Sequence, residues 1–294
     1  MLMKTKSDIA IDFTNYFLIT LFCVFCLIPL MIVISSSFTD ELALLKNGFA
    51  LWPSEFSTKA YETMFQTSRI FDAYKVTLFV VIVGTFLSMI LTSAIAYAIS
   101  VKTVKYRNHI AFFVFFTMLF SGGLVPTYLL IAKYLDMKDT IWVLIIPVLI
   151  SPWNMFLLRN FFSSIPDSLA ESAKMDGASE MTVLFRIILP VSMPAIATIS
   201  LFYALGYWNE WFNAMLYISE EKLYPLQYLI MDILRNIDFM NELAGKFGVS
   251  NAYTPPTYTA RMATTVLTIG PIVFIYPFVQ KYFVKGMMVG SVKG

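Results

Sequence analysis

Long apolar runs separated by polar connections dominate the pattern of this chain. A helix needs about 20 predominantly apolar residues to cross the hydrocarbon core of a bilayer. Six runs meet this requirement, at residues 12–35, 74–100, 109–132, 140–159, 190–218 and 262–284. We therefore predict an all-α membrane protein in which six transmembrane helices form a single domain over residues 1–294.

The first run reads as a retained helix. It is longer than the apolar part of a signal peptide, and it ends near Pro29 and Ser35–Ser37 without a small-residue cleavage pattern. We expect this segment to remain as the first span.

The connections predict an orientation. Two long polar connections, 36–73 and 219–261, fall on one side of the predicted membrane, and the amphipathic stretch 160–189 falls on the other. The short loop 101–108 carries three basic residues and no acid, and such loops favour the cytoplasm. We therefore expect both termini, the 160–189 loop and the tail 285–294 to be cytoplasmic, in a multi-pass protein of a bacterial inner membrane.

Composition agrees with membrane insertion and narrows the partners. The chain is 58% hydrophobic and 14% charged, and its mean hydropathy is +0.71. A net charge of +2 provides no basic field for nucleic acid, so we expect lipid contact and no nucleic acid partner. Cys23 and Cys26 lie inside an apolar run, and His109 lies at the edge of another, so we expect no metal site.

Residues 164–190 have the pattern of neither a membrane span nor an unstructured loop, and they predict two short helices. Ser164 can cap the first helix, with Pro166 near its opening turn. Gly177 can end that helix in a left-handed conformation, and Ser179 can cap the second.

The first of these helices carries a small-residue face. Ala170, Ala173 and Gly177 follow one another at spacings of three and four, which would let another backbone approach closely. The alternative is a solvated surface helix with an internal pair between Glu171 and Lys174.

Part of this loop resembles the EAA motif of ATP-binding-cassette importer permeases. Ser172 departs from the second alanine of the motif, but its side chain is still short. The matching residues are Glu171, Ala173, Asp176, Gly177, Leu189 and Pro190. The resemblance implies a type I importer permease fold in which a cytoplasmic coupling helix, within 160–189, sits in a cleft of the ATPase subunit.

Four further segments resemble the carbohydrate branch of these permeases. They are residues 96–98, 122–128, 224–227 and 276–294. The likeness is to the maltose-type second permease and, more closely, to permeases for complex oligosaccharides. It implies a permease subunit that forms half of the translocation pathway of an ATP-driven oligosaccharide importer.

The resemblance also implies partners. They are a second homologous permease, two ATPase subunits, an extracytoplasmic solute-binding lipoprotein and a carbohydrate substrate. In maltose-type systems the tail of the second permease inserts between the ATPase subunits, so the resemblance implies that Met287, Met288, Val289 and Gly290 dock there.

The chain lacks a nucleotide-binding signature. The pair Gly245–Lys246 has Met240 where the first glycine of a phosphate-binding loop should stand. We expect this chain to be a transport subunit that binds no cofactor, with ATP and Mg²⁺ bound by the partner ATPase.

The fifth run contains polar groups at predicted membrane depth, where they are costly unless they face protein or water. These residues and the aromatic rings beside them are Tyr207, Trp208, Asn209, Glu210 and Asn213. Rings that stack on sugars and groups that bind hydroxyls favour a place in the translocation pathway. An interfacial aromatic belt with helix-packing hydrogen bonds is the alternative.

Two other function classes fit the sequence less well. An ion-coupled secondary transporter of a small polar solute would also have several spans, but residues 1–147 and 148–294 show no repeat and the 160–189 loop would lack a purpose. An intramembrane enzyme is disfavoured because the sequence has no paired carboxylates, HExxH motif or Ser/His constellation.

Overall fold

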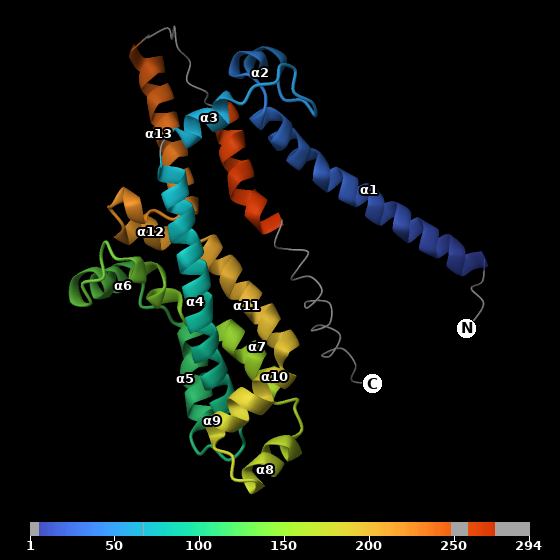
Figure 1. The fold of residues 1–294 in the computed structure, drawn as a ribbon, viewed down its shortest axis with the longest axis vertical. Coiled ribbons are helices and arrows are strands. Elements are labelled where there is room, and N and C mark those ends of the chain that lie inside the picture. The colour runs from blue at the N-terminus through green and yellow to red at the C-terminus, as the bar shows by residue number, and fades with distance from the viewer. Residues whose placement is uncertain (1–5, 67, 248–257, 274–294) are drawn as a thin grey trace. The chain divides into compact units, whose positions relative to one another are not determined.

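The computed structural model describes residues 6–66, 68–247 and 258–273 (Figure 1). Within these ranges the chain is helical, and the one β-bridge, between Thr39 and Phe56, belongs to no strand. The chain divides into two compact units. Of the described residues, unit 1 holds 6–66, 68, 233–247 and 258–272, and unit 2 holds 69–232 and 273.

Unit 1 contains the first predicted span as a long, exposed helix. The helix α1 (Lys6–Ser37) continues through Pro29, and its stretch Ile11–Ser37 is apolar and long enough to cross a membrane. Within unit 1, no described residue buries the most apolar part of this stretch. Side chains this apolar need a cover of lipid or protein.

The rest of unit 1 consists of shorter helices joined by polar contacts. The helices are α2 (Glu41–Asn47), α3 (Lys59–Phe65), the second half of α13 (Leu226–Phe247), and one over 258–273. The predicted polar connections 36–73 and 219–261 thus contain helices of their own.

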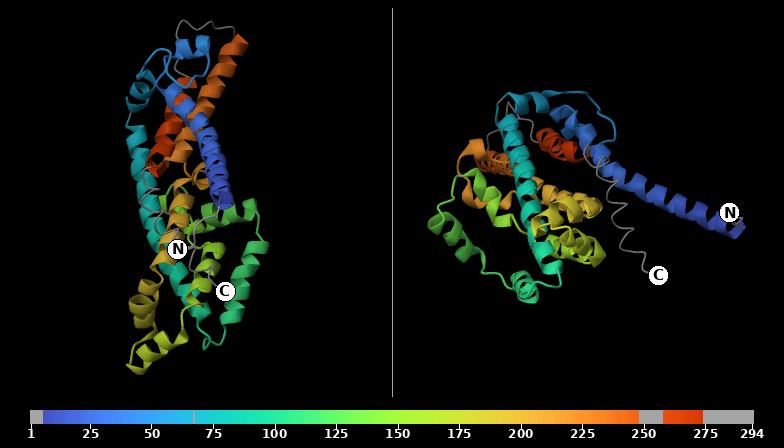
Figure 2. Two further views of the ribbon diagram at one scale, coloured as in Figure 1. Left: turned by 90° about the vertical axis from the view of Figure 1, so that its right-hand side faces the viewer. Right: turned by 60° about the horizontal axis from the view of Figure 1, so that its bottom comes forward.

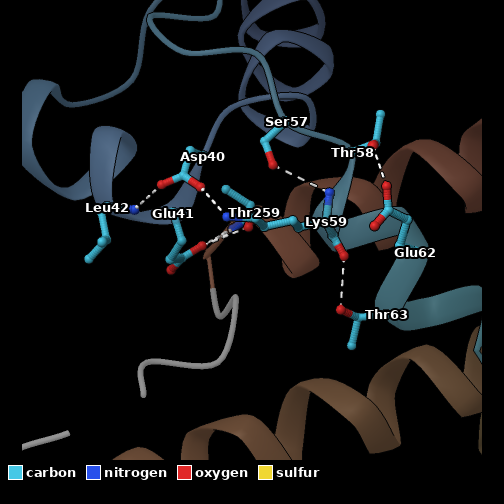
Figure 3. A network of polar contacts seen from close by, with 9 residues as sticks. All are labelled: Asp40, Glu41, Leu42, Ser57, Thr58, Lys59, Glu62, Thr63 and Thr259. Carbon is cyan, nitrogen blue, oxygen red and sulfur yellow. Dashed lines mark hydrogen bonds and ion pairs between the residues drawn. The ribbon is translucent and has the colours of Figure 1, made fainter. Parts of the chain in front are cut away.

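Asp40 caps α2 by accepting from the Leu42 N–H and pairs with Lys59 at 3.2 Å (Figure 3). The Lys59 hydrogen bond is the main reason that the pKa of Asp40 is lowered.

Glu41 ties α2 to the last described helix. Its buried carboxylate accepts a hydrogen bond from the Tyr258 N–H at 3.0 Å. It also accepts from the Thr259 N–H at 2.9 Å and from the Thr259 hydroxyl at 2.7 Å (Figure 3). The two N–H groups open the helix over 258–273, where a carboxylate satisfies donors that have no partner inside the helix.

Unit 2 is built around α4 (Arg69–Ser100), which is apolar and long enough to span a membrane. It packs against α7 (Pro152–Phe162) and α11 (Met193–Trp208). Fully buried side chains in this core include Val143, Leu144, Met155 and Leu158.

Shorter elements complete unit 2. The α-helices are α5 (Arg107–Leu119), α6 (Leu124–Leu129), α8 (Asp167–Met175), α9 (Glu180–Val183), α10 (Leu189–Val191), α12 (Phe212–Tyr217) and the start of α13. The 3-10 turns are Ile141–Leu144, Ile146–Val148 and Glu221–Leu223, and the π-helical turns are Leu130–Tyr134 and Leu184–Ile188.

The predicted span 109–132 is sharply bent. The helical segments Arg107–Leu119 and Leu124–Tyr134 meet at 112°. The chain between them contains Gly122 and Gly123, and Gly123 has φ +88°, which a residue with a Cβ adopts reluctantly. Pro126 then sits in the first turn of α6, where its missing N–H costs nothing.

Two other predicted spans are also bent. The segments Ile141–Val148 and Pro152–Phe162 meet at 51°, and Glu180–Val191 and Met193–Trp208 meet at 88°. Prolines at 152, 190 and 194 each remove a backbone donor, and they accompany these bends. The predicted continuous helix 190–218 therefore starts with a bend and, as shown below, breaks after Trp208.

By length and composition, the described part of the chain has two helices that could cross a membrane, or up to five if each bent pair is one span. The predicted sixth span, 262–284, begins in the helix over 258–273 and continues beyond the described residues. A count of six transmembrane helices remains a prediction.

Candidate functional site

The 160–189 loop lies at one end of unit 2, together with the turn between α4 and α5 (Figures 1 and 2). The Lys102 ammonium in that turn donates to Asp167 at the start of α8, over 2.6 Å. Both side chains are more than half exposed, so this pair guides the position of α8 more than it stabilises the fold.

The two predicted short helices are present, but one predicted cap is wrong. Gly177 has φ +84° after α8, and Ser179 accepts from the Thr182 N–H at 3.2 Å at the start of α9, both as predicted. Ser164 does not cap α8. Because extended Pro166 directly precedes the helix, α8 starts only at Asp167, and the Ser164 hydroxyl donates instead to the Phe161 carbonyl in the turn after α7.

The small-residue face of α8 is used inside the chain. Ala170 and Ala173 are half-buried and pack against the core of unit 2. The opposite side presents Glu171 and Met175, and Met175 is 89% exposed. A partner can therefore reach the outer side of α8 while its alanines hold it to this chain.

The loop is linked to α4 through Glu180, and Lys174 pairs with this residue instead of with Glu171. The Lys174 ammonium lies 2.6 Å from Glu180, not on Glu171, and the Tyr97 hydroxyl donates to the same Glu180 carboxylate at 2.7 Å. Lys174 chiefly, and Tyr97 after it, lower the pKa of Glu180. Glu180 thus joins α8, α9 and the end of α4.

The remaining residues of the EAA-like pattern are distributed over the loop. Asp176 is exposed at the end of α8, Leu189 is half-buried against the core, and Pro190 is exposed at the bend that leads to α11. The four predicted tail residues, Met287 to Gly290, lie outside the described residues.

The motif from Tyr207 to Asn213, which was predicted to lie within the fifth span, is at a break between two helices. α11 ends at Trp208, and α12 begins at Phe212. The Glu210 carboxylate accepts from the Asn213 N–H at 2.8 Å, and the Asn209 amide donates to the Leu205 carbonyl at 2.8 Å. Glu210 thus satisfies a backbone donor at the start of α12, and Asn209 adds a second hydrogen bond to a carbonyl that already accepts from its own backbone N–H.

A cavity of about 480 Å³ opens beside this break. Its lining includes Ser151, Trp153, Asn154, Tyr203, Tyr207 and Glu210. Of the five residues predicted to border the pathway, Tyr207 and Glu210 line this cavity. Trp208 is buried, and Asn209 and Asn213 are outside the lining.

Two residues of the fourth run, Trp153 and Asn154, line the cavity but were not predicted to do so. Trp153 and Asn154 repeat the aromatic–amide pair of Trp208 and Asn209, and this repetition was the available signal. The bend of 51° before α7 brings them into the lining of the cavity.

Two tyrosines on the cavity wall are fixed by α4. Tyr203 and Thr92 share a hydroxyl hydrogen bond of 2.6 Å, and Tyr203 also accepts from the Ser151 N–H at 2.9 Å. Tyr207 and Ser88 share one of 2.9 Å. Rigid aromatic rings beside an amide and a carboxylate suit a hydroxyl-rich ligand that has apolar ring faces.

The described residues contain no group of three or more histidine, cysteine, aspartate or glutamate side chains placed to hold a metal ion. The candidate site in this part of the chain therefore consists of hydrogen-bonding and aromatic side chains.

Comparison with known proteins gives the family. Residues 107–289 match the model of the family described as binding-protein-dependent transport system inner membrane component. The polygalacturonan/rhamnogalacturonan transport system permease protein YtcP of Bacillus subtilis is 41% identical over 283 residues, which are 96% of this chain and 98% of that protein. Protein LplC of the same organism is 40% identical over 99% of this chain and 97% of its own length.

A solved structure has the same fold. A bacterial ABC transporter involved in the import of the acidic polysaccharide alginate contains a chain that matches 96% of this one over its entire length. The TM-score is 0.82 and the sequence identity is 30%. This match supports the predicted type I permease fold.

These matches confirm the predicted class of function, a permease subunit of a carbohydrate importer, with ATP hydrolysis assigned to a separate subunit. They leave no ground for the alternative of an ion-coupled secondary transporter. This chain belongs to the family of inner membrane components of binding-protein-dependent transport systems, the permease subunits of ABC importers.

Proposed function

We propose that this chain forms one half of an oligosaccharide pathway through a bacterial cytoplasmic membrane. The cavity beside the α11 break carries the proposal, because Trp153 and Tyr203 present aromatic surface next to the Glu210 carboxylate. Relatives named for polygalacturonan/rhamnogalacturonan, arabinooligosaccharides and galactooligosaccharides support a substrate of this class.

The proposed assembly contains this chain, a second related permease, two ATPase subunits and an extracytoplasmic solute-binding lipoprotein. The description of the family supports the dependence on a binding protein. ATP and Mg²⁺ would be bound by the ATPase subunits, and this chain would bind no cofactor.

The proposed topology has six transmembrane helices with both termini in the cytoplasm. The cations of the α4–α5 turn support it, because they share an end of unit 2 with α8 and α9. Single-cysteine labelling in a chain that lacks Cys23 and Cys26 tests this topology. Labelling of a cysteine at position 171 exclusively from outside intact cells would contradict it.

The proposed coupling element is α8 with the turn to α9. Its outer side offers an exposed apolar contact at Met175 and acidic groups at Glu171 and Asp176, while Ala173 anchors it to the core. Through Glu180 and Tyr97, movement of this element would reach α4. Leu189 and Pro190 lie where the loop joins the fifth span.

The proposed role of the tail is to dock between the ATPase subunits through Met287, Met288, Val289 and Gly290. Deletion of residues 287–294 should leave pairing with the second permease unchanged but weaken ATPase retention and lower transport. Unchanged ATPase stoichiometry together with unchanged transport would contradict this role.

The pathway is tested by transport into vesicles that contain the complete importer, with a panel of oligosaccharides presented by the cognate binding protein. Trp153→Leu should lower transport without loss of assembly, because it removes aromatic surface from the cavity. Trp142→Leu is the matched control, since Trp142 is 45% exposed, packs edge-on against Phe79 and does not line the cavity. Equal loss of transport in both variants would contradict the pathway assignment.

A further inference from the structure

A second cavity, of about 130 Å³, lies where the α4–α5 turn, the end of α7 and the start of α8 meet. Its lining combines apolar side chains, including Phe162, Ile165 and Ile188, with three cationic residues, Lys102, Arg107 and Arg159. It is separate from the larger cavity and shares no lining residue with it.

The described residues do not balance the charge of this cavity. Asp167 is the one acidic residue in the lining, and it is already paired with Lys102 at 2.6 Å. Glu180, which contacts Tyr97 at the edge of the lining, is paired with Lys174. Among the described residues no carboxylate forms an ion pair with Arg107 or Arg159, so two guanidinium charges remain.

Arg159 supplies an independent sign of a missing partner. Its Nε atom is buried and has no hydrogen-bond partner among the described residues. A buried guanidinium N–H without an acceptor is costly, and arginine binds planar or tetrahedral oxyanions through such donors. An oxyanion in the cavity would remove this cost.

The position of the cavity indicates the source of the oxyanion. It lies at the end of the long apolar helix α4, where a span of this length reaches the boundary between hydrocarbon and water. Apolar walls next to cations match a phospholipid, whose phosphate lies just outside its acyl chains, and basic pockets between membrane helices bind anionic headgroups in this way.

We propose that this cavity binds the phosphate of an anionic phospholipid headgroup, with Arg159 and Arg107 as its principal ligands. Pro166, Asp167 and Ala170 at the base of α8 also line the cavity, so the bound headgroup contacts the proposed coupling element. Anionic lipid at this site fixes the base of α8 against α7 and the α4–α5 turn.

Binding is tested on the complete importer without measuring transport. The complex is purified from membranes, placed in phosphatidylcholine with an equal amount of phosphatidylglycerol, re-extracted in detergent and examined by native mass spectrometry for retained lipid. Arg159→Gln should reduce retained phosphatidylglycerol about fivefold or more, because each cation near a lipid headgroup contributes roughly 1 kcal/mol. Arg107→Gln should reduce it in the same direction.

Lys105→Gln is the matched control. Lys105 lies in the same turn and carries the same charge, but it does not line the cavity and sits over the ring of Tyr106 instead. Retention should stay unchanged in this variant. Equal loss in Lys105→Gln and Arg159→Gln would show general attraction to the membrane and would overturn the site.

A second arm separates lipid from free phosphate. In pure phosphatidylcholine, inorganic phosphate is titrated against the thermal unfolding temperature of the complex. A rise in the wild-type protein that Arg159→Gln abolishes, without selective lipid retention, would assign the site to a soluble phosphate and overturn the lipid. The absence of any difference between wild type and both arginine variants, for either anion, would overturn the site altogether.

Discussion

A Cβ atom added to Gly84 would lie 2.6 Å from Cζ of Tyr207. The ring of Tyr207 on α11 therefore packs directly on the α4 backbone, and its hydroxyl reaches Ser88 one turn further along the same helix. The wall of the larger cavity is thus set by the contact between α4 and α11. A glycine here lets the two helices approach closely, as small residues do in membrane helix packing.

Gly84→Ala should destabilise the complex by about 1–3 kcal/mol, because the new methyl group overpacks the α4–α11 contact. The thermal unfolding temperature should fall, and transport should fall because Tyr207 is displaced. Combining Gly84→Ala with Tyr207→Leu should recover part of the lost stability, since the smaller side chain relieves the overlap. Gly270→Ala is the control, because no described residue lies within 4 Å of its added Cβ. Equal destabilisation by both alanine variants would contradict the packing argument.

At Gly177 the cost of substitution comes from the backbone alone. No atom lies within 4 Å of an added Cβ, but φ is +84°. Gly177→Ala should therefore strain the turn between α8 and α9 by roughly 1 kcal/mol and weaken coupling of ATP hydrolysis to transport, whereas Gly177→Asn should be milder because asparagine tolerates this conformation. Gly177→Pro should be the most damaging, since proline fixes φ near −65°. Transport and ATPase activity of purified complexes measure the effect, and normal coupling in Gly177→Pro would exclude a role for this turn.

The Glu180 carboxylate should make its contribution at neutral pH. Because the folded state lowers its pKa, the stabilisation is present above the pKa of an unfolded glutamate and is lost as the pH falls through the lower folded pKa. Glu180→Gln should therefore reduce the communication between α8 and α4 at pH 7, with a small loss of stability because the pair is partly exposed to solvent. ATPase stimulation by the binding protein should drop in this variant while the complex remains assembled. Glu171→Gln, on the outer side of α8 that the partner is proposed to contact, should also lower stimulation while it leaves the link between Glu180 and Tyr97 intact. Unchanged stimulation in Glu180→Gln would contradict a role for that link.

Features of the fold that depend on neighbouring residues in the sequence were predicted better than features that depend on contacts between distant residues. The apolar runs locate the helices, and Gly177 and Ser179 act through their own backbone, so both are readable from the chain. The bend at Gly122–Gly123 was also present in the sequence, but the length of the apolar run around it favoured an uninterrupted span.

Nonlocal contacts explain what the sequence could not predict. Lys174 pairs with Glu180 across a turn, although the spacing of three residues within α8 favours Glu171, so a local rule predicts the wrong acid. Trp153 and Tyr203 lie 50 positions apart, yet they line one cavity because α7 and α11 both pack on α4. The helix break after Trp208 likewise depends on capping by the Glu210 side chain, which a hydropathy pattern treats as a costly charge.

Glu210 has both a structural and a pathway contact, and the two can be separated. Glu210→Gln keeps an oxygen that can accept from the Asn213 N–H, so the start of α12 should remain intact while the negative charge at the cavity is lost. We expect normal assembly and altered transport rate or oligosaccharide preference. Glu210→Ala removes the acceptor as well and should also lower the thermal unfolding temperature. If Glu210→Gln were as poorly assembled as Glu210→Ala, the packing role would dominate.

Glu41 should control the start of the helix over 258–273. Its carboxylate is buried and accepts from two backbone N–H groups and one hydroxyl, so Glu41→Ala leaves these donors without their acceptor (Figure 3). Loss of hydrogen bonds to a charged group costs about 1.5–3 kcal/mol each, less whatever water recovers. Hydrogen exchange gives a local measurement: the Tyr258 and Thr259 amides should exchange faster in Glu41→Ala, whereas amides of α4 should not change. Glu55→Gln is the control, because Glu55 is exposed in the same 36–73 connection. Unchanged protection of the two amides in Glu41→Ala would show that the helix start is held by other contacts, and faster exchange in Glu55→Gln would show that the effect is not specific to the cap.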